Sequence, residues 1–452
     1  MIPNDSMRKS FFNTLTRAYR CCWHGWTGAP IWRTVCGLGN PRDSRLGSLR
    51  YKQSANHSGM CRTLAACLAA ALMFSAARAD QGGNNLVVPR TLPKPGNTAP
   101  IWVSVSGFSG EGLEVLKFDL YVQGFGFTNS AEAQYQISGS DTGSVIGTLT
   151  DRVSGKPLFS NSYSGTSLRR QAHSFANDIV LAVTQTAGIG LTKIAFKRES
   201  APGHGEIYVA DFDGHDAVAV THDDKIVAAP CWVPGRMALY YTSYLPGNPD
   251  IFFMNLSTGQ RSIVSKFSGL NTAPAASPDG TRLAMVLSRS GSPNIWVANA
   301  DGSAPKRLTT STEDSSPCWS PDGQWICFAT KISERRVLAK VPAGGGEAQR
   351  LPTSGAPSPS QPDWSPDGRW IVFTQQTLSG FDLCVMPADG SGGPVVLVAG
   401  EDPSWSPNSR TLVFTRRTRG YNYALSVLDV MTKQVKDIQR TAGNDSQPAW
   451  AR

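Results

Sequence analysis

The sequence contains few histidines, and none of them lies in its second half. Six occur among 452 residues, and none follows His222. The second half alone therefore cannot supply a Ser-His-Asp catalytic set or a histidine-containing zinc site. The motifs G-x-S-x-G and H-E-x-x-H are also absent from the chain. These absences argue against the common hydrolase mechanisms, whereas a pair of catalytic carboxylates stays possible.

The chain also has little apolar sequence of membrane-spanning length. The run from Leu64 to Ala76 is too short to cross a bilayer as a helix, so we predict no membrane insertion. This run follows a basic start at Met60 and precedes an A-x-A site that ends at Ala79. We therefore predict a signal peptide over 60–79, cleaved between Ala79 and Asp80, and export to the periplasm. Residues 1–59 are interpreted as a mis-called start, with a genuine N-terminal extension as the alternative.

The basic character of the chain is confined to its beginning. Residues 1–79 carry 11 Lys/Arg and 2 Asp/Glu, which leaves 32 basic and 32 acidic residues for 80–452. The part that remains after cleavage is therefore neutral, and nothing in its charge predicts nucleic-acid binding.

Cysteine is scarce beyond the leader. Five of the nine cysteines lie in residues 1–79, and the others are spread over the second half at 231, 318, 327 and 384. Export would permit disulfides, but this spacing matches neither a disulfide framework nor a metal-ligand motif. We interpret the four as buried thiols and predict no metal and no cofactor.

What the second half does contain is a repeat. A proline followed two residues later by Trp, and then by Ser-Pro-Asp-Gly or a variant of it, recurs every 41 to 45 residues. A period of about 40–45 residues is the length of one four-stranded propeller blade. The copy at Pro274 lacks the Trp, and the copy at Pro230 lacks Asp-Gly. The repeat prolines are Pro230, Pro274, Pro317, Pro362, Pro403 and Pro448.

The repeat residues have turn and core roles. Pro presets φ, Asp caps its own turn, and Gly accepts the backbone that ends it. We assign Asp279, Asp322 and Asp367 to turns in preference to a ring of calcium ligands. The tryptophans are interpreted as core between neighbouring blades in preference to a ligand platform. They are Trp232, Trp319, Trp364, Trp405 and Trp450.

The ends of the repeat region set the number of blades. The first unit, which begins at Thr192, has no Pro-x-Trp strand before it, and the Pro-x-Trp strand ending at Trp450 has no blade behind it. The last strand therefore completes the first blade, which predicts a six-bladed β-propeller over 191–452.

A smaller domain precedes the propeller. Residues 80–100 are rich in Gly, Asn and Pro and are predicted to form a flexible arm. Residues 101–190 are predicted to form a small α/β domain, because strand patterns mix with two helical ones. The second helix is expected from Leu168 to Val183, with Ser167 as its cap and Gly188 as its stop. His173 is interpreted as a packed histidine on that helix and not as a catalyst.

Three segments around the domain boundary, together with the blades, resemble the TolB family of the Tol–Pal envelope system. The resemblance covers about residues 86–450, and the three segments placed directly before six blades are more specific than the blade motif, which many propellers carry. They are Leu168–His173, Ala176–Ile179 and Leu191–Phe196.

The resemblance implies a protein that binds proteins. In this family an N-terminal arm binds a TolA protein by strand addition, and one face of the propeller binds the lipoprotein Pal. At the matching positions, the arm is Leu86, Val87 and Val88, although prolines at 89, 93 and 95 limit strand addition to a short stretch. The Pal-binding face is expected in loops before the repeat prolines. Its residues are Leu270, Asn271, Thr272, Ala273, Asp314, Ser315, Ser316, Ser360 and Gln361.

The expected function is therefore a non-enzymatic periplasmic monomer that links TolA at the inner membrane to Pal at the outer membrane. It would support envelope integrity and outer-membrane constriction at division. One alternative is a propeller of the same architecture that binds another envelope partner. The other is a secreted hydrolase or lyase built on a propeller.

Overall fold

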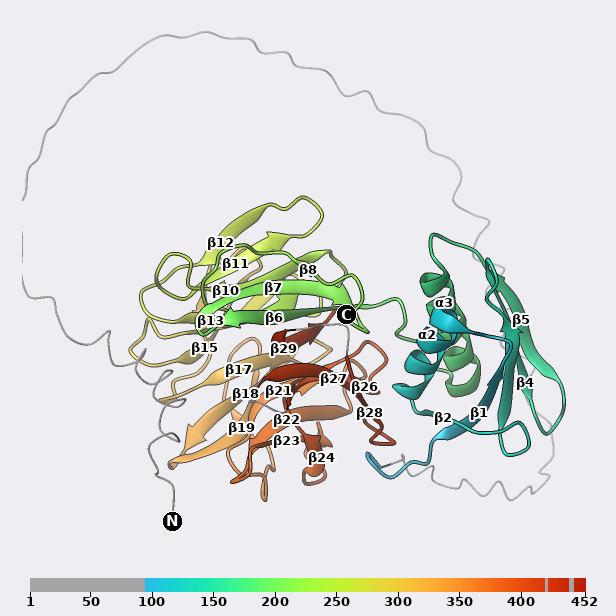
Figure 1. The fold of residues 1–452 in the computed structure, drawn as a ribbon. Coiled ribbons are helices and arrows are strands. Elements are labelled where there is room, and N and C mark those ends of the chain that lie inside the picture. The colour runs from blue at the N-terminus through green and yellow to red at the C-terminus, as the bar shows by residue number, and fades with distance from the viewer. Residues whose placement is uncertain (1–93, 419–421, 439–442) are drawn as a thin grey trace, which may run out of the picture. The chain divides into compact units, whose positions relative to one another are not determined.

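The computed structural model describes residues 94–418, 422–438 and 443–452. The predicted signal peptide, the cleavage site Ala79–Asp80 and the arm residues Leu86–Val88 lie outside the described residues. Within the described part of the chain, no helix is long and apolar enough to cross a membrane. The fold is mainly β, with a small α/β domain before six four-stranded sheets (Figure 1), which confirms the predicted fold class.

The α/β domain is a five-stranded sheet with two helices. The strands lie in the order β2-β1-β3-β4-β5, and β1 pairs in parallel with both β2 and β3 while the remaining pairs are antiparallel. Strand β2 has only three residues, and the sequence did not predict it. The elements are β1 (Ile101–Ser106), α2 (Gly110–Tyr121), β2 (Phe125–Phe127), β3 (Tyr135–Ser140), β4 (Val145–Asp151), β5 (Pro157–Tyr163) and α3 (Leu168–Thr184).

Both helices bury apolar residues against this sheet. Phe175 of α3 is fully buried and lies 5.6 Å from the ring of Phe108 and 5.6 Å from that of Tyr163. Gly147 of β4 lies directly beneath Phe175, and a Cβ at this position would overlap the phenyl ring. The helix therefore packs close to the sheet because β4 has no side chain there.

The ends of α3 show one prediction confirmed and one corrected. The Ser167 hydroxyl accepts a hydrogen bond from the Arg170 amide at 3.2 Å, as expected of an N-cap. The helix stops at Thr184, before the predicted Gly188, because Gln185 adopts a left-handed conformation with φ of 60°. Gln185 thus ends the helix in the left-handed conformation that the sequence analysis had assigned to Gly188.

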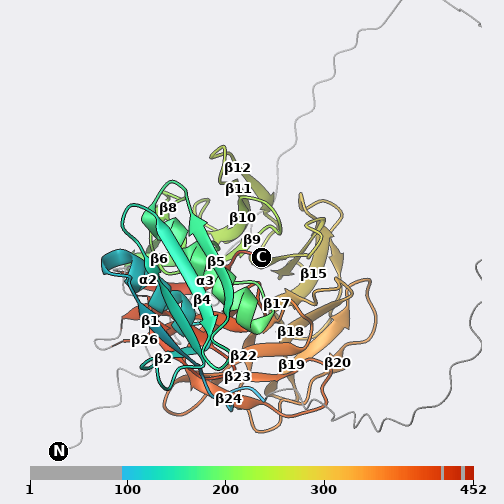
Figure 2. The ribbon, with the colours of Figure 1, turned by 90° about the vertical axis from the view of Figure 1, so that its right-hand side faces the viewer.

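Six four-stranded antiparallel sheets form the propeller, and they follow one another around a ring (Figure 2). Blade 1 contains β29 (Asn444–Trp450), β6 (Lys193–Ala201), β7 (His204–Asp211) and β8 (Val218–Ala219). Blade 2 contains β9 (Val227–Trp232), β10 (Ala238–Ser243), β11 (Asp250–Asn255) and β12 (Arg261–Ser265). Blade 3 contains β13 (Asn271–Ala276), β14 (Arg282–Leu287), β15 (Asn294–Asn299) and β16 (Lys306–Arg307).

The remaining three blades repeat this plan. Blade 4 contains β17 (Ser315–Trp319), β18 (Trp325–Ile332), β19 (Arg335–Pro342) and β20 (Gln349–Arg350). Blade 5 contains β21 (Ser360–Trp364), β22 (Trp370–Gln376), β23 (Phe381–Pro387) and β24 (Val395–Ala399). Blade 6 contains β25 (Glu401–Trp405), β26 (Thr411–Arg417), β27 (Tyr423–Asp429) and β28 (Val435–Asp437). In each blade the strand that carries the repeat proline lies at one edge of the sheet and contacts its counterparts in the neighbouring blades.

The two ends of the propeller close the ring, as predicted. Strand β29 pairs antiparallel with β6, so the last strand of the chain completes blade 1. Trp450 is buried, stacks on Phe212 at 6.0 Å and donates its indole N–H to the Thr192 hydroxyl at 2.8 Å. Residues from both ends of the propeller thus hold one another in a single blade.

The repeat motif forms the expected turns and core. In blade 3 the Ser277 hydroxyl donates to Asp279 Oδ1 at 2.5 Å, and the Thr281 amide donates to the same atom at 3.1 Å. These hydrogen bonds, the one from Ser277 first, lower the pKa of Asp279 to about 2. Trp319 Nε1 donates to the Ala275 carbonyl of the preceding blade at 2.8 Å. The turn role of Asp279 and the core role of Trp319 are therefore as predicted.

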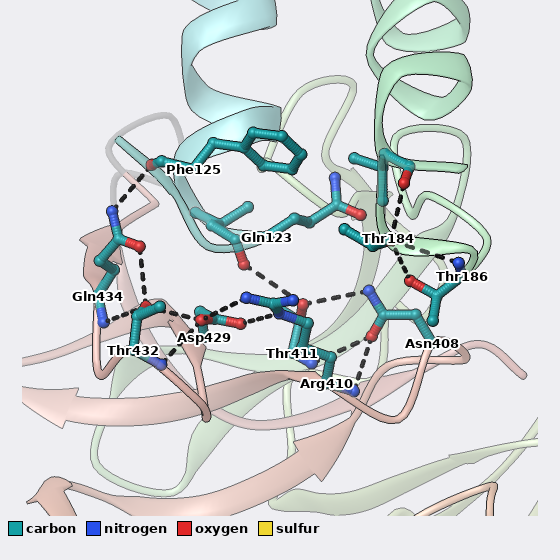
Figure 3. Close-up of polar contacts among 12 residues, drawn as sticks. Gln123, Phe125, Thr184, Thr186, Asn408, Arg410, Thr411, Asp429, Thr432 and Gln434 are labelled. Carbon is teal, nitrogen blue, oxygen red and sulfur yellow. Dashed lines mark hydrogen bonds and ion pairs between the residues drawn. The ribbon is translucent and has the colours of Figure 1, made fainter. Parts of the chain in front are cut away.

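The segment that follows α2 contacts blade 6 (Figure 3). The Thr411 hydroxyl donates to the Val122 carbonyl at 3.3 Å, and the Gln434 side-chain amide donates to the Phe125 carbonyl at 3.0 Å. Gly124 lies between these contacts with φ of 88°, and a Cβ there would overlap the Arg410 guanidinium. Glycine is thus required at this close approach.

Candidate partner-binding ring at the propeller axis

We call the six edge strands that carry the repeat prolines the axial strands; they are β9, β13, β17, β21, β25 and β29. The two residues before each repeat proline occupy equivalent places in the first half of these strands. We call these twelve residues the axial ring. They are Ala228, Ala229, Thr272, Ala273, Ser315, Ser316, Ser360, Gln361, Glu401, Asp402, Ser446 and Gln447. All twelve are half-buried, whereas all six repeat prolines are buried. The ring therefore has accessible side chains on a rigid, repeated backbone.

A β-bulge fixes the backbone of the ring. In each axial strand the pairing register shifts at the proline and the residue before it, because proline has no N–H to donate to the ladder. The residue before the proline has a φ between 50° and 53° in all six blades. These residues are Ala229, Ala273, Ser316, Gln361, Asp402 and Gln447. A left-handed conformation is uncommon for residues other than glycine, and such strain tends to persist where the surrounding fold enforces it.

The structure corrects the expectation that the predicted binding residues lie in loops. Asn271, Thr272 and Ala273 belong to β13, and Ser315, Ser316, Ser360 and Gln361 are likewise strand residues. Only Leu270 and Asp314 directly precede their strands. The residues nevertheless occupy matching positions in their blades, because each keeps its place relative to the repeat proline.

Two of the predicted binding residues are buried and have structural contacts. Asn271 is 0% exposed, accepts hydrogen bonds from Ser265 Oγ and the Phe267 amide, both at 2.8 Å, and donates to the Phe267 carbonyl at 2.7 Å. Asp314 is 1% exposed and accepts from Asn294 Nδ2 at 3.2 Å. Both lie three residues before a repeat proline, a position that is buried in every blade. Neither side chain is available to a partner in this conformation.

Hydrogen bonds join the ring across blades 5, 6, 1 and 2. Gln361 of blade 5 donates to the Asp402 carboxylate of blade 6, and Thr415 Oγ1 donates to Asp402 Oδ2 at 3.2 Å. The backbone N–H of Gln447 in blade 1 donates to Thr415 Oγ1 at 3.0 Å. The backbone N–H of Ala229 in blade 2 donates to the side-chain Oε1 of Gln447 at 2.9 Å. These hydrogen bonds cross-link the ring from Gln361 through Asp402 and Gln447 to the Ala229 backbone.

The ring positions on blades 3 and 4, together with Ser360 of blade 5, carry small side chains, as do Ala228, Ala229 and Ser446 on blades 2 and 1. Ala273, Ser315, Ser316 and Ser360 of blades 3, 4 and 5 are alanine or serine. Thr272 shares a hydrogen bond of 3.3 Å with Thr242 of blade 2. A protruding group of a partner meets least steric obstruction at these positions, where backbone and hydroxyl groups are within reach.

Charge in the ring is confined to blade 6. Glu401 and Asp402 are the charged members of the twelve, and the rest are neutral. Burial, and then the neighbouring charge of Asp402, raises the pKa of Glu401 to about 7. Burial raises the pKa of Asp402 to about 6, against the hydrogen bond from Thr415. The protonation of blade 6 therefore changes near neutral pH.

Sequence reasoning missed half of the axial ring. It named pairs in blades 3, 4 and 5 but not Ala228–Ala229, Glu401–Asp402 or Ser446–Gln447. The signal was available, since each missed pair stands directly before a repeat proline. It also missed that the residue one position earlier is buried, because burial there depends on the bulge between two strands.

His173 has the packed position that the sequence predicts. It is 3% exposed, its Nδ1 lies 2.7 Å from Asp119 Oδ2, and its ring meets Phe212 edge-on at 5.8 Å. Burial raises the pKa of Asp119. Arg169, one turn earlier on α3, forms an ion pair with Asp213 of blade 1. These buried charged groups lie where α2 and α3 meet the propeller.

One group in the described residues brings three potential metal ligands together. Asp211 is the last residue of β7, and His215 and Asp216 lie in the connection from β7 to β8. The Lys193 ammonium already contacts Asp211 Oδ1 at 2.7 Å, and Asp216 is exposed. The prediction that the protein binds no metal stays a prediction.

Comparison with known proteins identifies the family. The model of the family described as PD40, TolB beta propeller domain, matches residues 181–452, more than half of the chain. The Tol-Pal system protein TolB of Francisella tularensis subsp. tularensis (strain WY96-3418) is 31% identical over 150 residues, which are 31% of this chain and 34% of that protein. The protein of the same name from subsp. mediasiatica (strain FSC147) matches with the same identity and coverage. The chain thus aligns with about a third of the length of these relatives.

A solved structure extends the likeness to most of the fold. TolB from Acinetobacter baumannii superposes with a TM-score of 0.71 at 22% identity, covering 79% of this chain and 98% of the other. That coverage includes both the α/β domain and the propeller, because it exceeds the length of the propeller alone. The chain belongs to the TolB β-propeller family.

Proposed function

We propose that this protein is a non-enzymatic, periplasmic, protein-binding component of a Tol–Pal system. In this proposal the axial ring binds the lipoprotein Pal, and the arm residues Leu86–Val88 bind a TolA-like protein. The protein acts as a monomer that links inner and outer membrane, and so supports envelope integrity and constriction at division. The family membership and the names of the relatives support this assignment.

The axial ring is the observation on which the proposal rests. It presents half-buried residues near one end of the axial strands, with a neutral wall of small side chains from Thr272 to Ser360 on blades 3 to 5 and a carboxylate pair on blade 6, to which Gln361 of blade 5 donates a hydrogen bond. A loop of a partner can enter beside the small residues and meet a rigid, hydrogen-bonded wall opposite. The ring holds no histidine and no nucleophile paired with a base, which favours binding over catalysis.

Calorimetric titration tests the binding site directly. The fragment Asp80–Arg452 is titrated with the periplasmic domain of Pal from the same organism, and we expect saturable one-to-one binding. Ala273→Arg places a long charged side chain on the small-residue wall and should weaken binding by about tenfold or more through steric overlap and desolvation. Ala304→Arg is the matched control, since Ala304 also precedes a proline and has φ of 52°, but it is exposed in the outer turn of blade 3.

Each result has a distinct meaning. Equal weakening by both variants, or by neither, places the interface outside the axial ring. Absence of binding by a well-folded fragment contradicts the Pal assignment and favours the alternative, a propeller of this family that binds another envelope partner.

A further inference from the structure

Two of the four described cysteines face each other across one hairpin. In blade 4 Cys318 of β17 and Cys327 of β18 are direct partners in the antiparallel register, next to the pair Trp319 and Ile326. The residues opposite the other two cysteines are not cysteines: Cys231 faces Tyr240, and Cys384 faces Phe373 and Val396. The pairing across β17–β18 is therefore specific to one blade.

The distance between such positions suits a covalent bond. Opposite residues of an antiparallel pair have Cα atoms about 4.5–5.5 Å apart, within the range of about 4.4–6.8 Å found in disulfides. The two thiols are close enough to influence each other, because Cys327 contributes to the raised pKa of Cys318. Both are free in this structure, and both lie in the apolar core of blade 4, Cys318 at 8% and Cys327 at 0% exposure.

We propose that Cys318 and Cys327 form a disulfide when the chain folds in the presence of a disulfide-bearing oxidant. The thiolate of one cysteine attacks the oxidant R–S–S–R and releases one R–S⁻, giving a mixed disulfide. The thiolate of the other cysteine then attacks the protein sulfur and releases the second R–S⁻. The two thiol protons end on the two released R–SH molecules, and the oxidant is reduced by two electrons.

Burial decides when this exchange takes place. Burial, and then the hydrogen bond from Cys327, raises the pKa of Cys318 well above its ordinary value, so little thiolate exists in the folded blade. The bond therefore forms during folding, before the core of blade 4 closes. Once formed, it is protected from reductants by the same burial. The bond also fixes the register on the far side of the bulge that places Ser315 and Ser316 in the axial ring.

Refolding of the full chain under defined redox conditions tests the proposal. The denatured, reduced protein is refolded either with oxidised and reduced glutathione or with reductant alone, then denatured and treated with iodoacetamide. Trypsin releases both cysteines in one peptide, Leu308–Lys331. We expect this peptide to carry no alkyl group and to be lighter by two hydrogen atoms after oxidising refolding, and to carry two alkyl groups after reducing refolding.

Controls separate a specific bond from general oxidation. Cys384 is also buried, and its own tryptic peptide should be fully alkylated under both conditions. In Cys327→Ser, Cys318 should be alkylated after oxidising refolding as well. The oxidised wild-type protein should also melt a few degrees higher than the reduced protein, and this difference should vanish in Cys327→Ser.

One result would contradict the proposal. If the protein refolds natively in the glutathione buffer and the peptide Leu308–Lys331 still carries two alkyl groups, the proposal is wrong. The export and binding functions proposed above do not enter this test, because oxidant, protein and readout are all supplied in vitro.

Discussion

Asn271 and Thr272 are neighbours on β13 in very different surroundings. Asn271 is 0% exposed, whereas Thr272 is half-buried in the axial ring. The Asn271 side chain makes hydrogen bonds with Ser265, Phe267, Pro249 and Gly269. Asn271 was predicted to contact a partner, but its side chain instead stabilises the chain segment that leads into β13.

The replacement of Asn271 should consequently act on stability. Asn271→Ala leaves the Ser265 hydroxyl and the Phe267 amide without their acceptor inside the fold, which costs about 2–3 kcal/mol in the free energy of unfolding. Urea denaturation followed by fluorescence measures this change. Asn248→Ala, in an exposed turn of blade 2, should change it by less than about 0.5 kcal/mol. Equal stabilities of the two variants would contradict the structural role of Asn271.

The carboxylate pair of blade 6 predicts a dependence of stability on pH. In the unfolded chain both groups titrate near pH 4, whereas in the fold burial raises the pKa of Glu401 to about 7 and that of Asp402 to about 6. Between about pH 4 and pH 7 the folded state therefore binds more protons than the unfolded state. Stability must fall as the pH rises through this window, in contrast to a carboxylate whose pKa is lowered on folding.

The variant Glu401→Gln should flatten this dependence. The variant removes the group of the pair that has the higher pKa. The loss of stability from about pH 5 to about pH 8 should therefore shrink by on the order of 1 kcal/mol, a value that is reduced because Glu401 is partly exposed to solvent. Denaturation at both pH values measures it. Glu347→Gln, in the exposed connection between β19 and β20, should keep the wild-type dependence. If Glu401→Gln also keeps it, Glu401 does not titrate as inferred.

At the scale of strands and blades, closure of the ring depends on more than the pairing of β29 with β6. The side chain of Arg452, two residues beyond Trp450, reaches blades 5 and 6. It donates to the Trp405 carbonyl at 3.1 Å and the Trp364 carbonyl at 3.3 Å, and it pairs with Asp363. The last residue thus connects the terminal strand of blade 1 to two other blades.

Loss of the Arg452 side chain should therefore loosen β29. Arg452→Ala removes the donors of two backbone carbonyls and the partner of Asp363, and it should lower the free energy of unfolding by about 1–2 kcal/mol. Hydrogen exchange should rise first in β29 and β6 if closure is the step affected. Arg350→Ala, on the exposed strand β20, is the control and should leave exchange in these strands unchanged.

The success of sequence prediction also differs between elements. The blades and their closure could be predicted because the repeat encodes turns and core locally: Ser277 and Asp279 make the turn, and Trp319 reaches the preceding blade. Strand β2 could not be predicted from the sequence, since its three residues are too few to show a periodic pattern and their structure depends on pairing with β1. The extent of α3 was predicted to within one residue, but the residue that ends it was wrong, because Gln185 and not Gly188 takes the left-handed conformation.

The candidate site was predictable in position but not in detail. The repeat proline locates Ala273, Ser316 and Gln361, because it interrupts the ladder in every blade. Which residues beside the proline are accessible depends on the register shift between two paired strands. The sequence of one strand alone does not reveal that shift. The asymmetry of the ring, with Glu401 and Asp402 on one blade, appears only when all six copies are placed around the axis.

At the scale of the whole molecule, the described end of the arm is attached to the propeller. The Gly96 amide donates to the Val430 carbonyl at 2.8 Å, and the Thr98 amide donates to the Met431 carbonyl at 3.1 Å. Both acceptors lie in the turn between β27 and β28 of blade 6, the blade whose other end carries Glu401 and Asp402. The described end of the arm and the charged residues of the axial ring therefore lie on the same blade.

A deletion that keeps the contacts of Gly96 and Thr98 can separate binding of the TolA-like partner from binding of Pal. Removal of Asp80–Pro95 ends just before Gly96, so the contacts of Gly96 and Thr98 with blade 6 remain possible. We expect loss of binding to the TolA-like partner and a change of Pal affinity below about threefold, a coupling free energy of about 0.7 kcal/mol or less. Replacement of Leu86, Val87 and Val88 by serine keeps the chain length and should give the same result. Calorimetric titration with each partner measures both affinities, and loss of Pal binding in a variant with unchanged melting temperature would show that the arm and the ring form a single site.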